Sequence, residues 1–157
     1  SRWKAKITDF GLSCLKTCRR RTGRLVDNPT WLAPEIIMGR SYDEKADVYS
    51  FGIILFELME RKIFLEEFKF DWQKEEAICQ PERPKLSDSV PKNIGDLINK
   101  CWSLEVKNRP SIKEVVDQLL DETRTSRRSA ISRASSSTIS FQNEDSILDS
   151  SIRSVQS

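Results

Sequence analysis

The spacing of apolar residues predicts a short strand followed by helices. Apolar and basic residues alternate over residues 3–8, which is the period-2 pattern of a strand that ends at Asp9. No regular period continues over residues 12–30, where polar and basic residues predict a long loop. A short helix is expected over Pro34–Met38, because proline fits a first helical turn and Gly39 is placed to end the helix.

The segment Asp43–Arg61 is the most apolar helix expected in the chain. Its apolar residues surround nearly the whole helix, which predicts a position at the centre of a domain. Two amphipathic helices are expected over residues 94–102 and 112–120, where apolar positions recur at three- and four-residue intervals. Ser111 and Glu114 form a capping-box pattern at the start of the last helix.

Composition divides the chain into two parts. Residues 1–122 are long enough for one domain. The hydrophobic fraction of the whole 157-residue sequence, 38%, is enough for a single core. Residues 123–157 are rich in serine and arginine, and they hold too few apolar side chains to offset the entropy cost of ordering. We therefore expect a disordered tail. The net charge of +2 gives no footprint for nucleic acid.

Membrane and metal chemistry receive little support from the sequence. The longest apolar stretch, Val48–Met59, is shorter than the roughly 20 residues that span a bilayer. Cys14 and Cys18 could form half of a metal site, but the sequence has four cysteines without a matching second pair, and no histidine. Unpaired cysteines and the lack of a secretory signal predict a reducing, cytoplasmic setting.

Short motifs follow one another in a characteristic order and spacing. They are Asp9-Phe10-Gly11, Trp31-Leu32-Ala33-Pro34-Glu35, Asp47-Val48-Tyr49-Ser50-Phe51-Gly52, Cys101-Trp102 and Arg109-Pro110. Together they resemble the C-terminal lobe of a eukaryotic-type protein kinase domain over residues 3–122. The residue sequences of these motifs are most similar to those of the tyrosine-kinase-like group, whose members mostly phosphorylate serine and threonine. Asp27 and Asn28 depart from the Gly-Thr or Gly-Ser pair common at these places.

The resemblance implies a mainly α, partial kinase fold: a short N-terminal strand, an activation segment, helices and the disordered tail. The kinase signatures expected before Asp9 are not in this sequence, namely the glycine-rich phosphate loop, the strand lysine and the His-Arg-Asp loop. We therefore expect a piece of a longer kinase that is inactive by itself. Helices that normally pack on Asp43–Arg61 would also be missing, so an exposed apolar patch is predicted.

By resemblance, Asp9 ligates the Mg²⁺ that bridges the phosphates of ATP, Phe10 packs inward to set its placement, and Gly11 allows the turn. A lone aspartate before a turn would otherwise be a solvated cap. Glu35 and Arg109 resemble the ion pair that ties the activation segment to the loop before the last helix. Without the motifs, they would be independent surface charges.

The remaining residues of the resemblance have structural roles. Ala33 and Pro34 belong with Glu35 to the closing motif of the activation segment. Asp47 matches an aspartate that hydrogen-bonds the catalytic-loop backbone, although exposure in a first helical turn is the alternative. Trp102 is expected in the core rather than in a ligand site.

Several hydroxyl groups are candidates for phosphorylation. Ser13, Thr17, Thr22 and Thr30 lie in the predicted activation segment, where a phosphate could order the loop by pairing with arginines. An unmodified, solvated loop is the alternative. In the tail, basic residues precede Ser129, Ser135 and Ser154, which suggests sites for upstream, basic-directed kinases.

The sequence supports three functional hypotheses. The leading one is a piece of an ATP- and Mg²⁺-dependent serine/threonine kinase that acts on protein substrates. A pseudokinase lobe that recruits partners, or a naturally expressed inactive piece, are the alternatives. The parent protein could be cytoplasmic or a receptor with an internal kinase domain, and the oligomeric state stays open.

Overall fold

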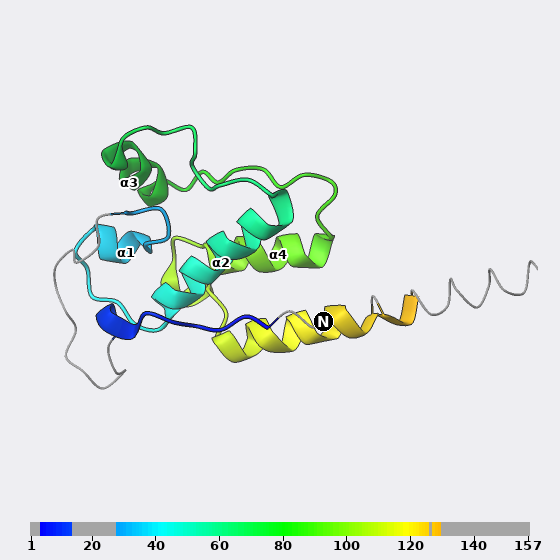
Figure 1. The fold of residues 1–157 in the computed structure, drawn as a ribbon. Coiled ribbons are helices and arrows are strands. Elements are labelled where there is room, and N and C mark those ends of the chain that lie inside the picture. Colours follow the sequence, from blue (N-terminus) through cyan, green and yellow to red (C-terminus); the bar gives the residue numbers. More distant parts are fainter. Residues whose placement is uncertain (1–3, 14–27, 126, 130–157) are drawn as a thin grey trace, which may run out of the picture. The chain divides into compact units, whose positions relative to one another are not determined.

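The computed structural model describes residues 4–13, 28–125 and 127–129. The described residues are mainly helical, and they fall into two compact units, Ser1–Lys113 and Glu114–Ser157 (Figure 1). The helices of the first unit are α1 (Pro34–Ile37), α2 (Lys45–Glu60), α3 (Asp71–Cys79) and α4 (Lys92–Cys101), with short 3-10 helices η1 (Phe10–Leu12) and η2 (Val106–Asn108). Among the described residues, no helix combines the length and apolarity needed to cross a membrane.

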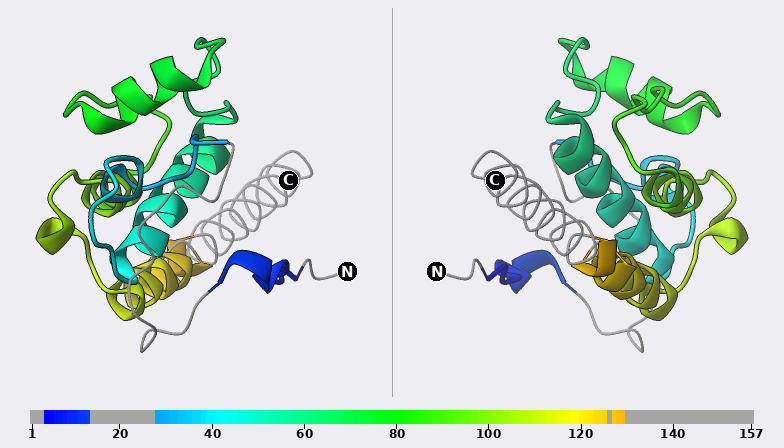
Figure 2. Two further views of the ribbon diagram at one scale, coloured as in Figure 1. Left: turned by 90° about the vertical axis from the view of Figure 1, so that its left-hand side faces the viewer. Right: turned by 90° about the vertical axis from the view of Figure 1, so that its right-hand side faces the viewer.

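The core of the first unit forms between α2 and α4, which lie side by side (Figures 1 and 2). Gly52 permits this close approach, because a Cβ atom at its position would lie only 2.7 Å from the Cβ of Cys101. The rings of Phe56, Phe64 and Trp102 pack together beside it, with centroids 5.4 to 6.0 Å apart. Trp102 is 2% exposed, so its predicted place in the core is confirmed.

The predicted central helix is buried on one side only. Its buried residues include Val48, Tyr49 and Ile53, whereas Ile54 and Leu58 remain 43% and 64% exposed. In the described structure α4 supplies packing for one face of α2. The exposed side agrees with the predicted apolar patch.

The predicted N-terminal strand is absent from the described residues. Residues 4–9 have no regular secondary structure and are exposed, and Ile7 is 86% exposed. The prediction fails because an alternating pattern becomes a strand only when a neighbouring strand pairs with its backbone, and the described part of the chain provides none.

Helix α3 was not predicted as a separate element. Its sequence has little amphipathic character, and within this helix Ile78 is the only buried residue. The helix begins where the Phe70 backbone N–H donates to Gln73 Oε1 at 3.3 Å. Such local capping, together with contacts to α1, holds a helix that apolar periodicity does not reveal.

The last helix covers residues 112–125, and residues 127–129 are also helical. It begins directly after Ser111, as the capping pattern predicts. Helix therefore extends beyond residue 122, the predicted end of the folded domain. Hydroxyl groups donate to carbonyls one turn earlier, as Thr123 Oγ1 does to Leu119 at 2.9 Å. The rest of the predicted tail lies outside the described residues.

Candidate functional site

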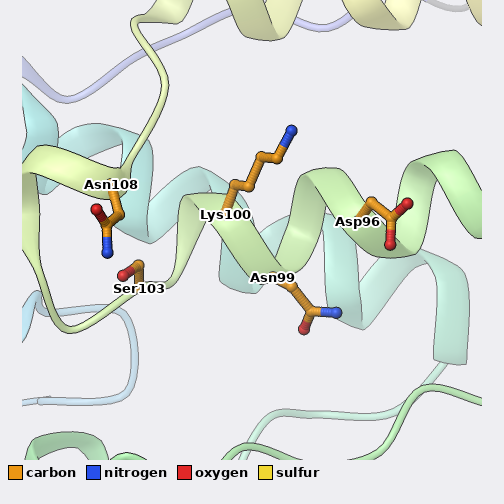
Figure 3. Close-up of a pocket in the computed structure, with 5 residues that line it drawn as sticks. All are labelled: Asp96, Asn99, Lys100, Ser103 and Asn108. Carbon is orange, nitrogen blue, oxygen red and sulfur yellow. The ribbon is translucent and has the colours of Figure 1, made fainter.

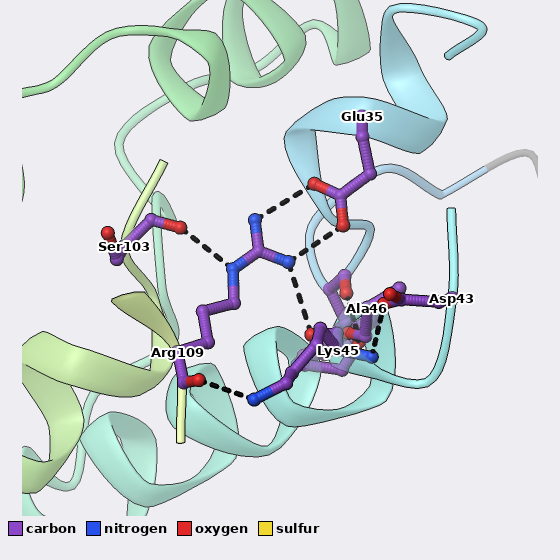
Figure 4. A network of polar contacts seen from close by, with 8 residues as sticks. Glu35, Asp43, Lys45, Ala46, Ser103 and Arg109 are labelled. Carbon is purple, nitrogen blue, oxygen red and sulfur yellow. Dashed lines mark hydrogen bonds and ion pairs between the residues drawn. The ribbon is translucent and has the colours of Figure 1, made fainter. Parts of the chain in front are cut away.

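The predicted ion pair between Glu35 and Arg109 is present and buried (Figure 4). Arg109 Nη1 donates to Glu35 Oε1 at 2.7 Å, and Nη2 donates to Oε2 at 2.9 Å. The Arg109 side chain is 0% exposed, and the Glu35 side chain is 7% exposed. This parallel arrangement is the bidentate geometry that only a guanidinium can offer a carboxylate. The alternative of two independent surface charges is therefore wrong.

Backbone carbonyls complete the surroundings of the Arg109 guanidinium. Nε donates to the carbonyl of Ser103 at 2.8 Å, and Nη1 also donates to the carbonyl of Lys45 at 3.1 Å. Lys45 in turn donates from Nζ to the Arg109 carbonyl at 2.6 Å (Figure 4). Arg109 thus joins α1, the start of α2 and the segment after α4, which are far apart in sequence. Neutralisation and hydrogen bonding together allow this charge to be buried.

The ring of Tyr49 forms one wall of this network. The guanidinium carbon of Arg109 lies 5.0 Å from the ring centroid, and that of Arg83 lies 5.9 Å away. The Tyr49 hydroxyl is buried without a hydrogen-bond partner among the described residues. Burial raises the pKa of Tyr49 to about 12, although the two arginines oppose the shift. Burial also raises the pKa of the nearby Cys101 thiol to about 11.

Helix α1 places Glu35 in this network. Ala33 is fully buried as the N-cap residue, and Pro34 occupies the first helical position, where no backbone donor is needed. The Arg40 N–H donates to the Glu35 carbonyl at 2.7 Å and closes the turn after the helix. Ala33 and Pro34 therefore have the structural setting expected of the closing motif.

The segment before α1 is fastened to α2 by Trp31. Its Nε1 donates to Glu57 Oε2 at 3.2 Å, and the Ser50 hydroxyl donates to the Trp31 carbonyl at 2.6 Å. The other Glu57 oxygen accepts the backbone N–H of Phe64 at 3.0 Å. A single carboxylate thereby links the segment before α1 with the loop after α2.

The Asp9 turn has a different character. Asp9 adopts a left-handed conformation, with φ 62° and ψ 63°, and precedes η1. The Ser13 hydroxyl and backbone N–H both donate to the Phe10 carbonyl, at 2.7 and 3.1 Å. Phe10 is 66% exposed, so the expected inward packing is wrong for this structure. Gly11 does not adopt a positive φ.

Asp47 is exposed in the first turn of α2, with no hydrogen bond of its carboxylate within the described structure. Partial burial and the like charge of Glu44 raise its pKa. This setting agrees with the simple exposed alternative. The predicted hydrogen bonds to a catalytic loop concern residues beyond this sequence.

The structure separates the phosphorylation candidates. Thr30 is 2% exposed, and its hydroxyl donates to Asn28 Oδ1 at 2.8 Å, so its interpretation as an accessible phosphorylation site is wrong. Ser13 is exposed, and Ser129 is exposed while donating to the Thr125 carbonyl at 3.1 Å. The other phosphorylation candidates, Thr17, Thr22, Ser135 and Ser154, lie outside the described residues. So do Cys14 and Cys18, which were considered as half of a metal site.

An open hollow of about 420 Å³ lies beside α4 (Figure 3). Its polar lining consists of Asp96, Asn99, Lys100, Ser103 and Asn108. None of the predicted catalytic or metal-binding residues lines this hollow. It shares Ser103 with the Arg109 network, because the Ser103 carbonyl accepts a hydrogen bond from Arg109 Nε.

Sequence reasoning missed the residues that support the ion pair through their backbone. Ser103 and Lys45 contribute carbonyl oxygens, which every residue type possesses, so the sequence carries no signal for them. The Lys45 ammonium and the Glu57 carboxylate also escaped notice. Their charges occur on a helix where a solvated position is the ordinary expectation.

Known proteins match most of the chain. The family model described as "Protein tyrosine and serine/threonine kinase" matches residues 1–119. The dual specificity protein kinase shkA of Dictyostelium discoideum is 39% identical over 122 residues, covering 73% of this chain and 23% of that protein. A second Dictyostelium protein, named "Probable serine/threonine-protein kinase pats1", is 41% identical over 117 residues, covering 74% of this chain and 4% of that protein.

The chain thus spans less than a quarter of the length of these two relatives. The matched region contains Asp9, Glu35 and Arg109 and ends within the last helix. With the motifs, their order and the buried ion pair, this establishes that the chain belongs to the protein kinase family and represents the C-terminal lobe of its catalytic domain.

Proposed function

We propose that this chain is the C-terminal lobe of a kinase that transfers the γ-phosphate of ATP to serine and threonine hydroxyls of proteins. Residues of the longer protein, outside this 157-residue sequence, would supply the phosphate loop, the strand lysine and the catalytic aspartate. The lobe by itself would then lack the groups that hold ATP and activate the acceptor hydroxyl.

The buried Glu35–Arg109 pair is the observation that supports this proposal most strongly. It fixes the end of the activation segment to α2 and to the loop before the last helix, through bidentate contacts of 2.7 and 2.9 Å. Phosphoryl transfer depends mainly on positioning, since the protein performs little covalent chemistry. A C-terminal lobe that holds the activation segment in place meets this requirement.

Asp9 has the chemistry needed for Mg²⁺. Its carboxylate is exposed beside a tight turn, and Mg²⁺ prefers oxygen ligands from one or two carboxylates, water and substrate phosphates. The bound ion would neutralise charge on the ATP phosphates. Asp9 would hold the ion. Gly11 follows it in η1, where an added Cβ would make only an ordinary contact of 3.6 Å with Asp9 Oδ1.

The preference for serine and threonine follows from the wording of the motifs and from the relatives' names. One relative is named as a serine/threonine kinase and another as a dual specificity kinase, so some activity on tyrosine is compatible with the family. Protein substrates, upstream kinases that act on Ser13 or Ser129, and a cytoplasmic setting all remain predictions.

A phosphotransfer assay tests the proposal. The full-length protein and this 157-residue chain would be incubated with labelled ATP, Mg²⁺ and a mixed protein substrate, followed by phosphoamino acid analysis. We expect phosphoserine and phosphothreonine from the full-length protein and no transfer from the chain alone. Tyrosine labelling alone would contradict the specificity, and an inactive full-length protein would favour the pseudokinase alternative.

A further inference from the structure

The start of α3 presents two exposed aromatic side chains. Phe70 is 60% exposed and Trp72 is 61% exposed. Hydrogen bonds fix the backbone around them, because the Phe70 N–H donates to Gln73 Oε1 at 3.3 Å and the Gln73 N–H donates to the Phe70 carbonyl at 3.1 Å. We call Phe70 and Trp72 the aromatic pair. Exposed aromatic rings on a fixed backbone are typical of surfaces that bind another protein.

Charge around the aromatic pair is mostly negative. The exposed carboxylates over residues 66–76 are those of Glu66, Glu67, Asp71 and Glu76, and the exposed ammonium group is that of Lys69. Four negative charges against one positive charge attract a cationic partner and disfavour an anionic one. The aromatic pair therefore has the surroundings expected of a surface that binds a basic partner.

Trp72 and Glu76 are neighbours on the surface of α3. They lie four residues apart within the helix Asp71–Cys79, which places them on one face. A guanidinium can stack on an indole ring and also form two parallel hydrogen bonds with a carboxylate. A lysine ammonium lacks this planar shape, so the two side chains together favour arginine. Phe70, directly before the helix, adds apolar surface for a residue beside that arginine.

The position of α3 indicates which kind of protein would bind there. Helix α3 lies at the edge of the first unit and contacts α1, which carries Glu35 (Figures 1 and 2). Glu35 belongs to the motif that closes the activation segment. A protein held at α3 is therefore tethered close to the end of this segment, which raises the local concentration of its other residues there. Such tethering favours a protein substrate as the occupant.

We propose that the aromatic pair and Glu76 bind an arginine-containing, apolar segment of protein substrates, separate from the residue that is phosphorylated. The arginine stacks on Trp72 and pairs with Glu76, and a neighbouring apolar side chain contacts Phe70. This proposal rests on the proposed function, because only a kinase uses the bound protein as a phosphate acceptor.

Peptide binding by the full-length protein tests the recognition without any need for catalysis. The labelled protein would be applied to an array of short random-sequence peptides. We expect arginine beside an apolar residue to be enriched about threefold or more among bound peptides, as a cation–π contact at an exposed site allows. Trp72→Ala should abolish this enrichment. Because Trp72 is exposed, its removal should leave the fold intact.

Charge reversal provides a second readout that unfolding does not imitate. Glu76→Lys should replace the preference for arginine by a preference for aspartate and glutamate. The matched control is Glu105→Lys, which makes the same change of charge at an exposed carboxylate outside α3. The control should keep the arginine preference of wild type, because it leaves the aromatic pair and Glu76 in place.

Steady-state kinetics of the full-length protein test the substrate role. The peptide that binds best, added to a phosphotransfer reaction on mixed protein substrates, should raise their KM and leave kcat unchanged. Trp72→Ala should likewise raise KM about threefold at constant kcat, because it removes a contact that is present equally in the ground state and the transition state.

The two assays fail separately. Equal peptide preferences in wild type and Trp72→Ala would overturn the docking proposal, even if phosphotransfer were normal. An inactive full-length protein that keeps its arginine preference would overturn the proposed function, and the substrate assignment with it. An arginine preference that appears only after deletion of residues 130–157, or dimers that Trp72→Ala dissociates, would also overturn the proposal. The occupant would then be the chain's own tail or a second copy.

Discussion

The carboxylates of Glu35 and Asp9 both belong to kinase motifs, yet their surroundings differ completely. Glu35 is buried and receives two hydrogen bonds from Arg109, whose remaining contacts reach α2 and the segment after α4. Asp9 is exposed in a left-handed turn, next to a phenylalanine that is 66% exposed. One motif is integrated into the core of this lobe, and the other is presented on its surface.

The difference shows which features a lobe can build from its own residues. Partners of Arg109 come from three parts of the described chain, so the network needs nothing further. A magnesium site requires phosphates and further ligands, and Asp9 supplies only one carboxylate. We therefore expect changes at the Arg109 network to act on folding, and changes at the Asp9 turn to act on catalysis.

The largest effect on stability is expected for Arg109→Met. The substitution would leave the Glu35 carboxylate buried without its partner, at a cost of about 3–5 kcal/mol in the free energy of unfolding. Arg109→Lys keeps a charge but loses the fork geometry, and it should cost roughly 1–3 kcal/mol. Urea unfolding followed by tryptophan fluorescence measures both values.

Arg124→Met is the matched control, because Arg124 pairs with Asp121 only at the exposed surface. Its effect should stay within about 0.5 kcal/mol. If Arg109→Lys were as stable as wild type, the buried pair would not be the support that the comparison assigns to it.

A pH-dependent loss of stability is expected next. The folded state holds the Tyr49 proton up to a pKa of about 12, compared with an ordinary value of 10.0. This contribution is complete below pH 10 and is lost as pH rises towards 12, by about 2–3 kcal/mol. Cys101, with a pKa of about 11, acts in the same direction from pH 9 upwards.

Tyr49→Phe separates these two contributions. The variant should lose the decline between pH 10 and 12 that Tyr49 causes, while the part due to Cys101 remains. At neutral pH its stability should change by about 1 kcal/mol or less, since the buried hydroxyl has no partner to lose. Unfolding curves collected from pH 7 to 12 would reveal an unchanged slope if this assignment were incorrect.

A smaller effect is expected for Gly52→Ala at the contact between α2 and α4. The new methyl group would lie 2.7 Å from Cys101 Cβ and 3.2 Å from the Trp102 nitrogen. Overpacking should cost a net 1–3 kcal/mol, roughly, even though alanine favours a helix. Gly11→Ala serves as control, because its nearest neighbour is 3.6 Å away. Equal unfolding free energies for the two variants would contradict the close helix contact.

The sequence predicts the helical part of this fold well where one face of a helix is apolar. The expected helices at residues 34–38, 43–61, 94–102 and 112–120 correspond to described helices. Helix α3 was not predicted, because it buries few residues and therefore has no clear apolar pattern. Local capping at Phe70 stabilises it instead. The strand expected at residues 3–8 depends on pairing, which the pattern of one segment does not contain.

The candidate site shows the same division. The Glu35–Arg109 pair was predicted by the resemblance of two motifs to those of protein kinases. The carbonyls of Lys45 and Ser103 were not, because backbone acceptors leave no trace in residue identity. The exposure of Phe10 was unpredictable for another reason: a motif predicts a side chain's role, whereas its packing depends on the neighbours that surround it.

The smallest effect on stability is expected for Asp9→Asn, within about 0.5 kcal/mol, because the exposed turn contributes few contacts. Its effect on catalysis should be the largest of all. If Asp9 holds Mg²⁺ as proposed, its loss should remove several kcal/mol of charge stabilisation, which corresponds to about a 10³-fold slower reaction.

Phosphotransfer by full-length wild type and Asp9→Asn, with urea unfolding of both, is therefore the most direct test. We predict that Asp9→Asn unfolds like wild type and transfers phosphate about 10³-fold more slowly. Equal phosphotransfer rates would contradict the central claim that the exposed Asp9 turn is the catalytic part of this lobe.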